Sequence, residues 1–287
     1  MRLVLALIAV FFTGPVLAQG TVLESKQFDS RALGHPMAYS IYLPEGHANA
    51  MERFPVLYLL HGLGGGETDW IKAGGVAHTA DRLIASGEID PLVIVMPDGS
   101  DSWYVNSKAR GGPGDFETAI GTDLQDHIEK TYPIRTDRNG RAIAGLSMGG
   151  FGAMRFAMTA PGRYVAAVSL SGAIVTDDTP ETPLSQQQIK LFRKAFGTPF
   201  DAETFNAENL FRYLDRLAAS PQKPALLITV GDDDYFKLYD GAFALFKALK
   251  SANVPNEFRV TDGNHSWRLW SQELETALMF VDAAWKN

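Results

Sequence analysis

The sequence contains no cysteine in its 287 residues. This absence excludes disulfide cross-links, thiolate-bound zinc or iron–sulfur centres, and a cysteine nucleophile. Basic side chains are outnumbered by acidic ones, 26 to 33, which gives a formal net charge of −7. An acidic balance disfavours a nucleic-acid partner, which needs a basic surface, and adsorption to anionic membranes. The composition, 46% hydrophobic and 21% charged, is typical of a folded globular protein.

The N-terminal apolar run, Leu3–Phe12, is too short to cross a bilayer, which takes about 20 residues. A positive residue precedes the run, and small residues follow it up to Ala18. This layout predicts a secretory signal peptide over residues 1–18, cut between Ala18 and Gln19. We therefore expect a secreted or periplasmic mature chain, 19–287, without integral membrane contact.

Strand-like and helix-like segments alternate along the mature chain. Apolar runs with β-branched members predict strands at 37–43, 55–60, 92–96, 142–144, 165–170, 225–230 and 258–260. Amphipathic or small-residue stretches predict helices at 74–87, 116–131, 148–159, 239–252 and 267–285. This alternation favours a single α/β domain with a mostly parallel sheet flanked by helices. Residues 173–222 break the rhythm and are predicted to form a small helical cap, inserted above the strand ends.

Gly145-Leu146-Ser147-Met148-Gly149 lies between a predicted strand and a predicted helix. In that context the G-x-S-x-G pattern predicts a tight turn that exposes a nucleophilic serine above the sheet. The two glycines carry no side chains that would collide where strand and helix approach each other. The alternative is a glycine-rich helix start with an incidental serine.

A glycine-rich loop, His61-Gly62-Leu63-Gly64-Gly65-Gly66, follows the predicted strand 55–60. Acyl transfer needs two N–H donors for the carbonyl oxygen as it becomes an oxyanion. We expect one donor at Met148 and the other in this loop, at Leu63. Phosphate binding is the alternative, but the loop lacks the G-x-G-x-x-G and Walker patterns. His61 is predicted to orient the loop and not to act as a base.

His265 is the candidate base, because it follows the last predicted strand and is the only histidine after the candidate acids. Those acids are the three aspartates at 232–234, which follow the strand 225–230. Three consecutive aspartates also suit a helix cap or a cation site, but the sequence shows no further spaced oxygen ligands. We therefore predict no metal and no cofactor. The order serine, aspartate, histidine is that of α/β-hydrolases.

Together these motifs resemble the esterase D family of α/β-hydrolases. The resemblance is carried, in order along the mature chain, by His61-Gly-Leu-Gly-Gly, Met96-Pro-Asp-Gly, Gly145-Leu-Ser-Met-Gly-Gly, Gly231-Asp-Asp-Asp and Gly263-Asn-His-Ser-Trp. That family includes S-formylglutathione hydrolases, feruloyl and acetyl xylan esterases, tributyrin-type esterases and the antigen 85 mycolyltransferases.

The resemblance implies a role for each matching position. Ser147 matches the nucleophile, His265 the base, and the Gly-x-x-Asp pattern points to Asp234 as the acid. Leu63 and Met148 match the two backbone donors of the oxyanion hole. The implied activity is serine carboxylesterase hydrolysis through an acyl-enzyme, on short-chain, aryl or sugar esters that are small molecules or linked to glycans.

Several aromatic residues lie on or beside the motif loops. Trp70, Trp103, Tyr104 and Trp267 are predicted to line a substrate pocket, although core packing would explain each of them equally well. Trp270 lies three residues after Trp267, so at least one of the two is expected to pack inward. Two other functions remain open: acyl transfer of the antigen 85 type, with a sugar hydroxyl in place of water, and a non-catalytic binding protein.

Overall fold

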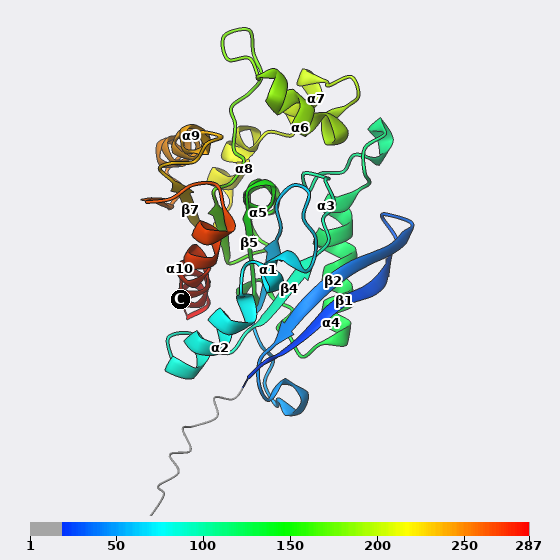
Figure 1. The fold of residues 1–287 in the computed structure, drawn as a ribbon, viewed down its shortest axis with the longest axis vertical. Coiled ribbons are helices and arrows are strands. Elements are labelled where there is room, and N and C mark those ends of the chain that lie inside the picture. Colours follow the sequence, from blue (N-terminus) through cyan, green and yellow to red (C-terminus); the bar gives the residue numbers. More distant parts are fainter. Residues whose placement is uncertain (1–18, 287) are drawn as a thin grey trace, which may run out of the picture.

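The strands of this chain form one eight-stranded sheet, seen in a computed structural model that describes residues 19–286 (Figure 1). The predicted signal peptide, 1–18, lies outside the described residues. The strands are β1 (Thr21–Ser30), β2 (His35–Leu43), β3 (Val56–Leu60), β4 (Val93–Pro97), β5 (Arg141–Leu146), β6 (Ala166–Leu170), β7 (Ala225–Gly231) and β8 (Glu257–Thr261). Their order across the sheet is β1-β2-β4-β3-β5-β6-β7-β8.

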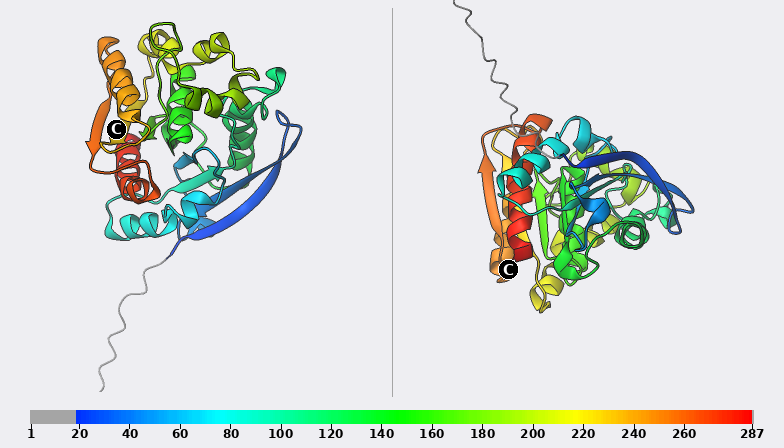
Figure 2. Two further views of the ribbon diagram at one scale, coloured as in Figure 1. Left: turned by 45° about the horizontal axis from the view of Figure 1, so that its top comes forward. Right: turned by 90° about the horizontal axis from the view of Figure 1, so that it is seen from below.

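All strands from β4 to β8 across the sheet run parallel, and β1 and β2 are antiparallel additions at one edge. Parallel strands end at a common edge of the sheet. Loops that leave the carboxyl ends of β3, β5, β7 and β8 therefore converge, although they are far apart in sequence. β8 forms the opposite edge of the sheet, as the turned views show (Figure 2).

Helices cover both faces of the sheet (Figures 1 and 2). One face is covered by α2 (Val76–Ser86) and α10 (Trp267–Lys286). The other is covered by α5 (Met148–Thr159), α9 (Leu238–Ser251) and a helical stretch made of α3 (Phe116–Thr118), a π-helical segment (Ala119–Leu124) and α4 (Gln125–Thr131). A short helix, α1 (Asp69–Lys72), precedes α2. Among residues 19–286, none of the helices combines the length and apolar character needed to cross a membrane.

The apolar runs of the sequence explain this layered core. Side chains alternate between the two faces of a strand, so a run with no polar interruption suits a strand that is covered on both sides. In β3, Val56, Tyr58 and Leu60 pack in the core with α5, whereas Leu57 and Leu59 pack on the side of α2 and α10. The predicted strands and helices match the observed ones to within a few residues.

Strand β1 was not predicted from the sequence. It is an edge strand, and most of its side chains are exposed, so its sequence carries no regular hydrophobic alternation. Its pairing with β2 is also irregular between Leu23 and Lys26, where Ser25 has a φ of 48°. This bulge shifts the inward and outward pattern that would otherwise identify a strand.

The segment between β6 and β7 contains no strand and forms a cap above the carboxyl edge of the sheet (Figure 1). Its helices are α6 (Gln186–Phe196), α7 (Ala202–Ala207), a 3-10 turn (Leu210–Tyr213) and α8 (Leu214–Ala219). Arg155 of α5 ties the cap to the body, because its guanidinium donates to the Glu208 carboxylate at 2.6 Å and to the Tyr213 hydroxyl at 2.7 Å.

Candidate active site

Ser147 occupies the sharp turn between β5 and α5. Its backbone has φ 53° and ψ −117°, a conformation with positive φ that is strained for a residue with a side chain. The turn is tight, since a Cβ added at Gly145 would lie 2.4 Å from the Gly149 carbonyl oxygen. A Cβ at Gly149 would lie 2.5 Å from the Leu60 carbonyl oxygen. Both flanking glycines of the motif are therefore required by close backbone packing.

The side chains of Ser147, His265 and Asp234 form a continuous hydrogen-bonded chain. His265 Nδ1 lies 2.8 Å from Asp234 Oδ2, and His265 Nε2 lies 3.0 Å from Ser147 Oγ. A carboxylate can only accept a hydrogen bond, so the imidazole proton belongs on Nδ1. Nε2 is then free to accept the hydroxyl proton of Ser147. Asp234 is 2% exposed, and its second oxygen accepts the backbone N–H of Phe236 at 2.9 Å.

Only one of the three consecutive aspartates reaches His265. The carboxylate of Asp232 accepts the N–H of Gly263 at 3.0 Å, and the N–H of Asp233 donates to the Gly263 carbonyl at 2.9 Å. Both residues thus brace the loop that carries His265. The carboxylates of Asp232, Asp233 and Asp262 lie within 4.8 Å of one another and are exposed. Asp262 is a third carboxylate that the sequence did not associate with this cluster.

The two predicted oxyanion donors, Leu63 and Met148, come from two segments that meet at Ser147. Met148 is the first residue of α5, and Leu63 lies in the loop after β3. Within residues 19–286, neither backbone N–H donates to another group. The helix dipole of α5 adds a favourable potential for negative charge at this point. Two free donors beside a serine hydroxyl are the arrangement that an oxyanion requires.

His61 holds the loop after β3 in place and makes no hydrogen bond to Ser147. Its Nδ1–H donates to the Gly62 carbonyl at 2.7 Å, and its Nε2 accepts the N–H of Gly99 at 2.8 Å. The Tyr104 hydroxyl donates to the His61 carbonyl at 2.9 Å. Burial and the nearby Asp98 carboxylate raise the pKa of Tyr104 well above its usual value, so the hydroxyl keeps its proton.

Two of the four aromatic residues predicted to bind substrate do not line the cleft. Trp70 is 1% exposed, packs edge-on against Trp267, and donates its indole N–H to the Leu60 carbonyl. Tyr104 is fully buried and donates its hydroxyl proton to the His61 carbonyl in the loop after β3. The prediction was wrong for these two residues, because proximity to a motif in sequence does not determine on which side of a loop a ring packs. Trp103 and Trp267 do line the cleft.

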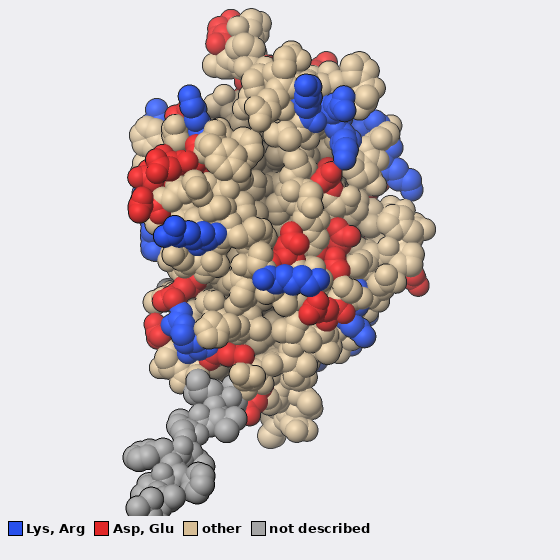
Figure 3. All heavy atoms as spheres, in the orientation of Figure 1, with Lys and Arg blue, Asp and Glu red and all other residues tan. Residues whose placement is uncertain are grey.

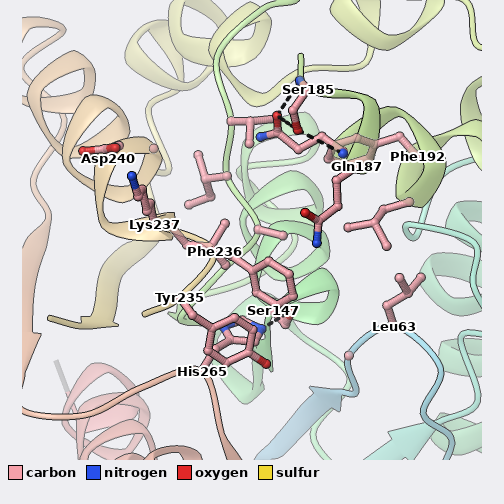
Figure 4. Close-up of a pocket in the computed structure, with 18 of the residues that line it drawn as sticks. Leu63, Ser147, Ser185, Gln187, Phe192, Tyr235, Phe236, Lys237, Asp240 and His265 are labelled. Atoms are coloured by element: carbon pink, nitrogen blue, oxygen red, sulfur yellow. Dashed lines mark hydrogen bonds between the residues drawn. The ribbon is translucent and has the colours of Figure 1, made fainter. Parts of the chain in front are cut away.

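The cleft itself has a volume of about 960 Å³ and lies between the cap and the carboxyl edge of the sheet (Figure 4). Most of its lining is uncharged, and the space-filling view shows charged side chains mainly around the margins of the hollow below the cap (Figure 3). Trp103 forms part of the cleft wall, and its ring centroid lies 4.2 Å from that of Phe192 in α6.

Sequence reasoning missed several lining residues. Tyr235 and Phe236 directly follow Asp234. Both rings lie edge-on against the His265 imidazole, with ring centroids 5.8 and 5.0 Å from the imidazole centroid. Their position next to the acid was a usable signal. The cap residues Leu191 and Phe192 gave no such signal, since an amphipathic helix pattern does not say which surface the helix packs against.

Chemically, the arrangement suits attack by a serine hydroxyl on a carbonyl carbon. His265 can take the hydroxyl proton, Asp234 can stabilise the resulting imidazolium, and two N–H donors can stabilise an oxyanion. Ser147 and His265 line an accessible cleft, and Asp234 is buried behind His265.

Comparison with known proteins places the chain among hydrolases. The family model described as "Putative esterase" matches residues 30–281. "Esterase Rv1288" of Mycobacterium tuberculosis (strain H37Rv) is 36% identical over 264 residues, which cover 84% of this chain and 55% of that protein. "Endo-1,4-beta-xylanase/feruloyl esterase" of Xylanibacter ruminicola is 30% identical over 214 residues, which cover 73% of this chain and 28% of that protein.

A solved structure described as a ferulic acid esterase has a TM-score of 0.76 and 29% identity, covering 93% of this chain and 99% of its own. The predicted α/β-hydrolase fold is therefore confirmed. This chain spans 55% of the length of the Mycobacterium tuberculosis relative and 28% of the length of the Xylanibacter ruminicola relative.

Proposed function

The chain belongs to the family described as "Putative esterase", and we propose that it is a serine carboxylesterase whose catalytic residues are Ser147, His265 and Asp234. One observation carries this proposal above the others. The three side chains form an unbroken hydrogen-bonded chain that ends on a strained serine at the floor of an accessible cleft. A binding protein that only kept the fold would not need this alignment.

The proposed reaction has two steps. His265 Nε2 takes the hydroxyl proton as Ser147 Oγ bonds to the ester carbonyl carbon, and the oxyanion accepts the N–H groups of Leu63 and Met148. The C–O bond to the alcohol then breaks, and the alcohol leaves with the proton from His265. Water adds to the acyl-enzyme with His265 as base, and collapse releases the acid and returns a proton to Ser147.

The cleft favours uncharged esters with a short or flat acyl group. Trp103, Ile174 and Phe192 contribute an apolar wall against which an alkyl chain or aromatic ring can pack. The charged residues of the lining are Lys237, Asp240 and Asp69, so the cleft carries both signs and does not favour an ionic substrate of one sign. Relatives named as feruloyl esterases support an aryl ester as one substrate class.

The test compares wild type and Ser147→Ala in the hydrolysis of 4-nitrophenyl acetate, 4-nitrophenyl butyrate and methyl ferulate. Removal of the nucleophile is expected to lower kcat by roughly 10⁵- to 10⁶-fold, because only direct attack by water, aided by the oxyanion donors and by substrate binding, then remains. Ser251→Ala, an exposed serine at the end of α9, is the matched control and should retain full activity. Comparable activity of Ser147→Ala would overturn the proposal.

The acyl-enzyme is tested separately by mass spectrometry after rapid acid quench. An increase in protein mass equal to the acyl group should appear on wild type and be absent from Ser147→Ala. Adding a sugar alcohol at high concentration measures how much acyl group goes to an acceptor instead of water. We expect free acid as the main product, and a dominant transfer product would instead identify an acyltransferase.

We also propose that residues 1–18 direct export and that the enzyme works outside the cytoplasm. The support is the apolar run Leu3–Phe12 followed by small residues before Gln19. Expression of the full chain in a bacterium, followed by fractionation and N-terminal sequencing, should recover protein that starts at Gln19 in the periplasm or medium. Uncut protein confined to the cytoplasm would contradict export.

A further inference from the structure

Glu273 of α10 is a buried carboxylate that the proposed reaction does not use. It is 5% exposed and lies outside the cleft lining. Its two oxygens accept the hydroxyl protons of Thr229 and Thr261, the second at 2.6 Å. Thr229 lies in β7, and Thr261 is the last residue of β8. One buried side chain therefore joins α10 to two neighbouring strands of the sheet.

The two strands that Glu273 joins are those that carry the acid and the base. β7 ends shortly before Asp234, and β8 ends shortly before His265. The loops that follow these strands are in close contact, since a Cβ added at Gly231 would lie 2.2 Å from the Gly263 carbonyl oxygen. A shift of one strand end against the other would therefore change the distance between the carboxylate and the imidazole.

α10 also contacts the base directly. The Trp270 ring lies edge-on against the His265 imidazole, with the two ring centroids 4.8 Å apart. Leu269 packs against the strand ends, because its Cδ2 lies 2.9 Å from the position of a Cβ added at Gly231. Residues three and four apart share a face of a helix, so Leu269 and Trp270 lie on the same face as Glu273. The hydrogen bonds of Glu273 thus fix the rotation of the helix face that packs against His265.

We propose that Glu273 is a positioning residue for the acid and the base, which holds His265 at hydrogen-bond distance from Ser147 and Asp234 by bonding to β7 and β8 together. The inference rests on the proposed esterase function. Catalysis depends steeply on the geometry of the reacting groups, and a misplacement of about 1 Å can lower the rate by roughly 100-fold. Loss of the two hydrogen bonds should therefore lower the reactivity of Ser147 much more than the binding of substrate.

The test measures kcat and KM for 4-nitrophenyl acetate, the rate of labelling by a fluorophosphonate, and Tm. Glu273→Met keeps the length of the side chain and removes both acceptors. We expect it to lower kcat by roughly 10- to 100-fold and to change KM less than about threefold. The labelling rate should fall with kcat, because labelling also needs Ser147 activated by His265. Glu273→Gln should keep kcat within about threefold of wild type, since an amide can accept one threonine hydroxyl and donate to the other.

Asp282→Leu is the matched control. Asp282 is a second buried carboxylate of α10, also 5% exposed, and it accepts the Asp90 N–H at 2.9 Å toward the other end of the helix. Its loss should lower Tm, as Glu273→Met does, and leave kcat within about twofold of wild type. Thr261→Val keeps the shape of the side chain and removes one of the two hydrogen bonds, so it tests the same point if Glu273→Met does not fold. We expect it to lower kcat by roughly three- to tenfold.

Each outcome of this experiment decides the inference. Unchanged kcat in Glu273→Met overturns it, as does unchanged kcat in Thr261→Val if the first variant does not fold. An equal loss of kcat in Asp282→Leu would assign the effect to a general loosening of α10, which also overturns it. An equal loss in Glu273→Gln would assign the effect to the charge and not to the hydrogen bonds, with the same consequence. Failure of wild type both to hydrolyse the ester and to become labelled would instead refute the proposed function.

Discussion

Replacement of Arg155 by methionine tests how the cap is attached to α5, the helix that follows Ser147. Arg155 is 3% exposed, and its guanidinium donates to the carboxylates of Glu117 and Glu208 at 2.9 and 2.6 Å. It also donates to the Tyr213 hydroxyl at 2.7 Å. Glu208 and Tyr213 belong to the cap, whereas Glu117 belongs to α3 of the body. One buried cation therefore joins three elements.

The expected loss of stability follows from this burial. Removing one partner of a buried ion pair costs roughly 3–5 kcal/mol, because the remaining charge is left without compensation. The side chains of Glu117 and Glu208 are 25% and 23% exposed, so water can partly solvate them in the variant. We therefore expect Arg155→Met to lower the free energy of unfolding by about 3 kcal/mol, at the low end of that range.

Urea unfolding followed by circular dichroism measures this loss. Methionine keeps most of the aliphatic stem, so cavity formation contributes little. Arg268→Met, at an exposed arginine of α10, is the control and should stay within about 0.5 kcal/mol of wild type. A loss below about 1 kcal/mol in Arg155→Met would refute the reasoning. The KM for aryl esters should also rise, since the cap supplies one wall of the cleft.

Three further predictions concern the catalytic floor. Asp234→Asn should lower kcat by roughly 10³- to 10⁴-fold on a nitrophenyl ester, because His265 loses the acceptor that orients its proton, and a loss below tenfold would contradict this role. Gly149→Ala should lower kcat at least tenfold and reduce Tm, since the new Cβ would lie 2.5 Å from the Leu60 carbonyl oxygen. Tyr104→Phe should lower stability by roughly 1–2 kcal/mol in urea unfolding, by removing the donor to the His61 carbonyl.

Much of the fold could be predicted because burial on both faces of a parallel strand leaves a strong local pattern. The strands β3 and β4 are uninterrupted apolar segments, β5 is apolar after Arg141, and every residue in the three strands is buried. Strand β1 has no such pattern, because it is an exposed edge that is held in place by pairing with β2. Its position depends on a partner strand, and that information is not contained in its own residues.

The candidate site likewise contains residues that the sequence indicated and residues whose roles only the structure explains. Ser147 and His265 stand in motifs whose spacing is set by the local turn, so sequence alone indicated both. The motif pattern also selected Asp234, but only tertiary structure shows why its neighbours differ: Asp232 and Asp233 brace the loop at Gly263. Likewise, Trp70 packs in the core and Trp103 in the cleft wall, although both lie beside motif loops.

The sequence by itself determined the α/β architecture and the local motifs that carry Ser147, Asp234 and His265, because each motif depends on residues that are near one another in the chain. Only the tertiary structure decided which surroundings each of several identical, consecutive residues meets. Gln186, Gln187 and Gln188 read alike, yet Gln187 and Gln188 line the cleft, Gln186 does not, and only Gln188 closes the capping box of α6. The physical reason is that a helix turns by about 100° per residue, so consecutive side chains meet different surroundings once the helix is docked on Trp103.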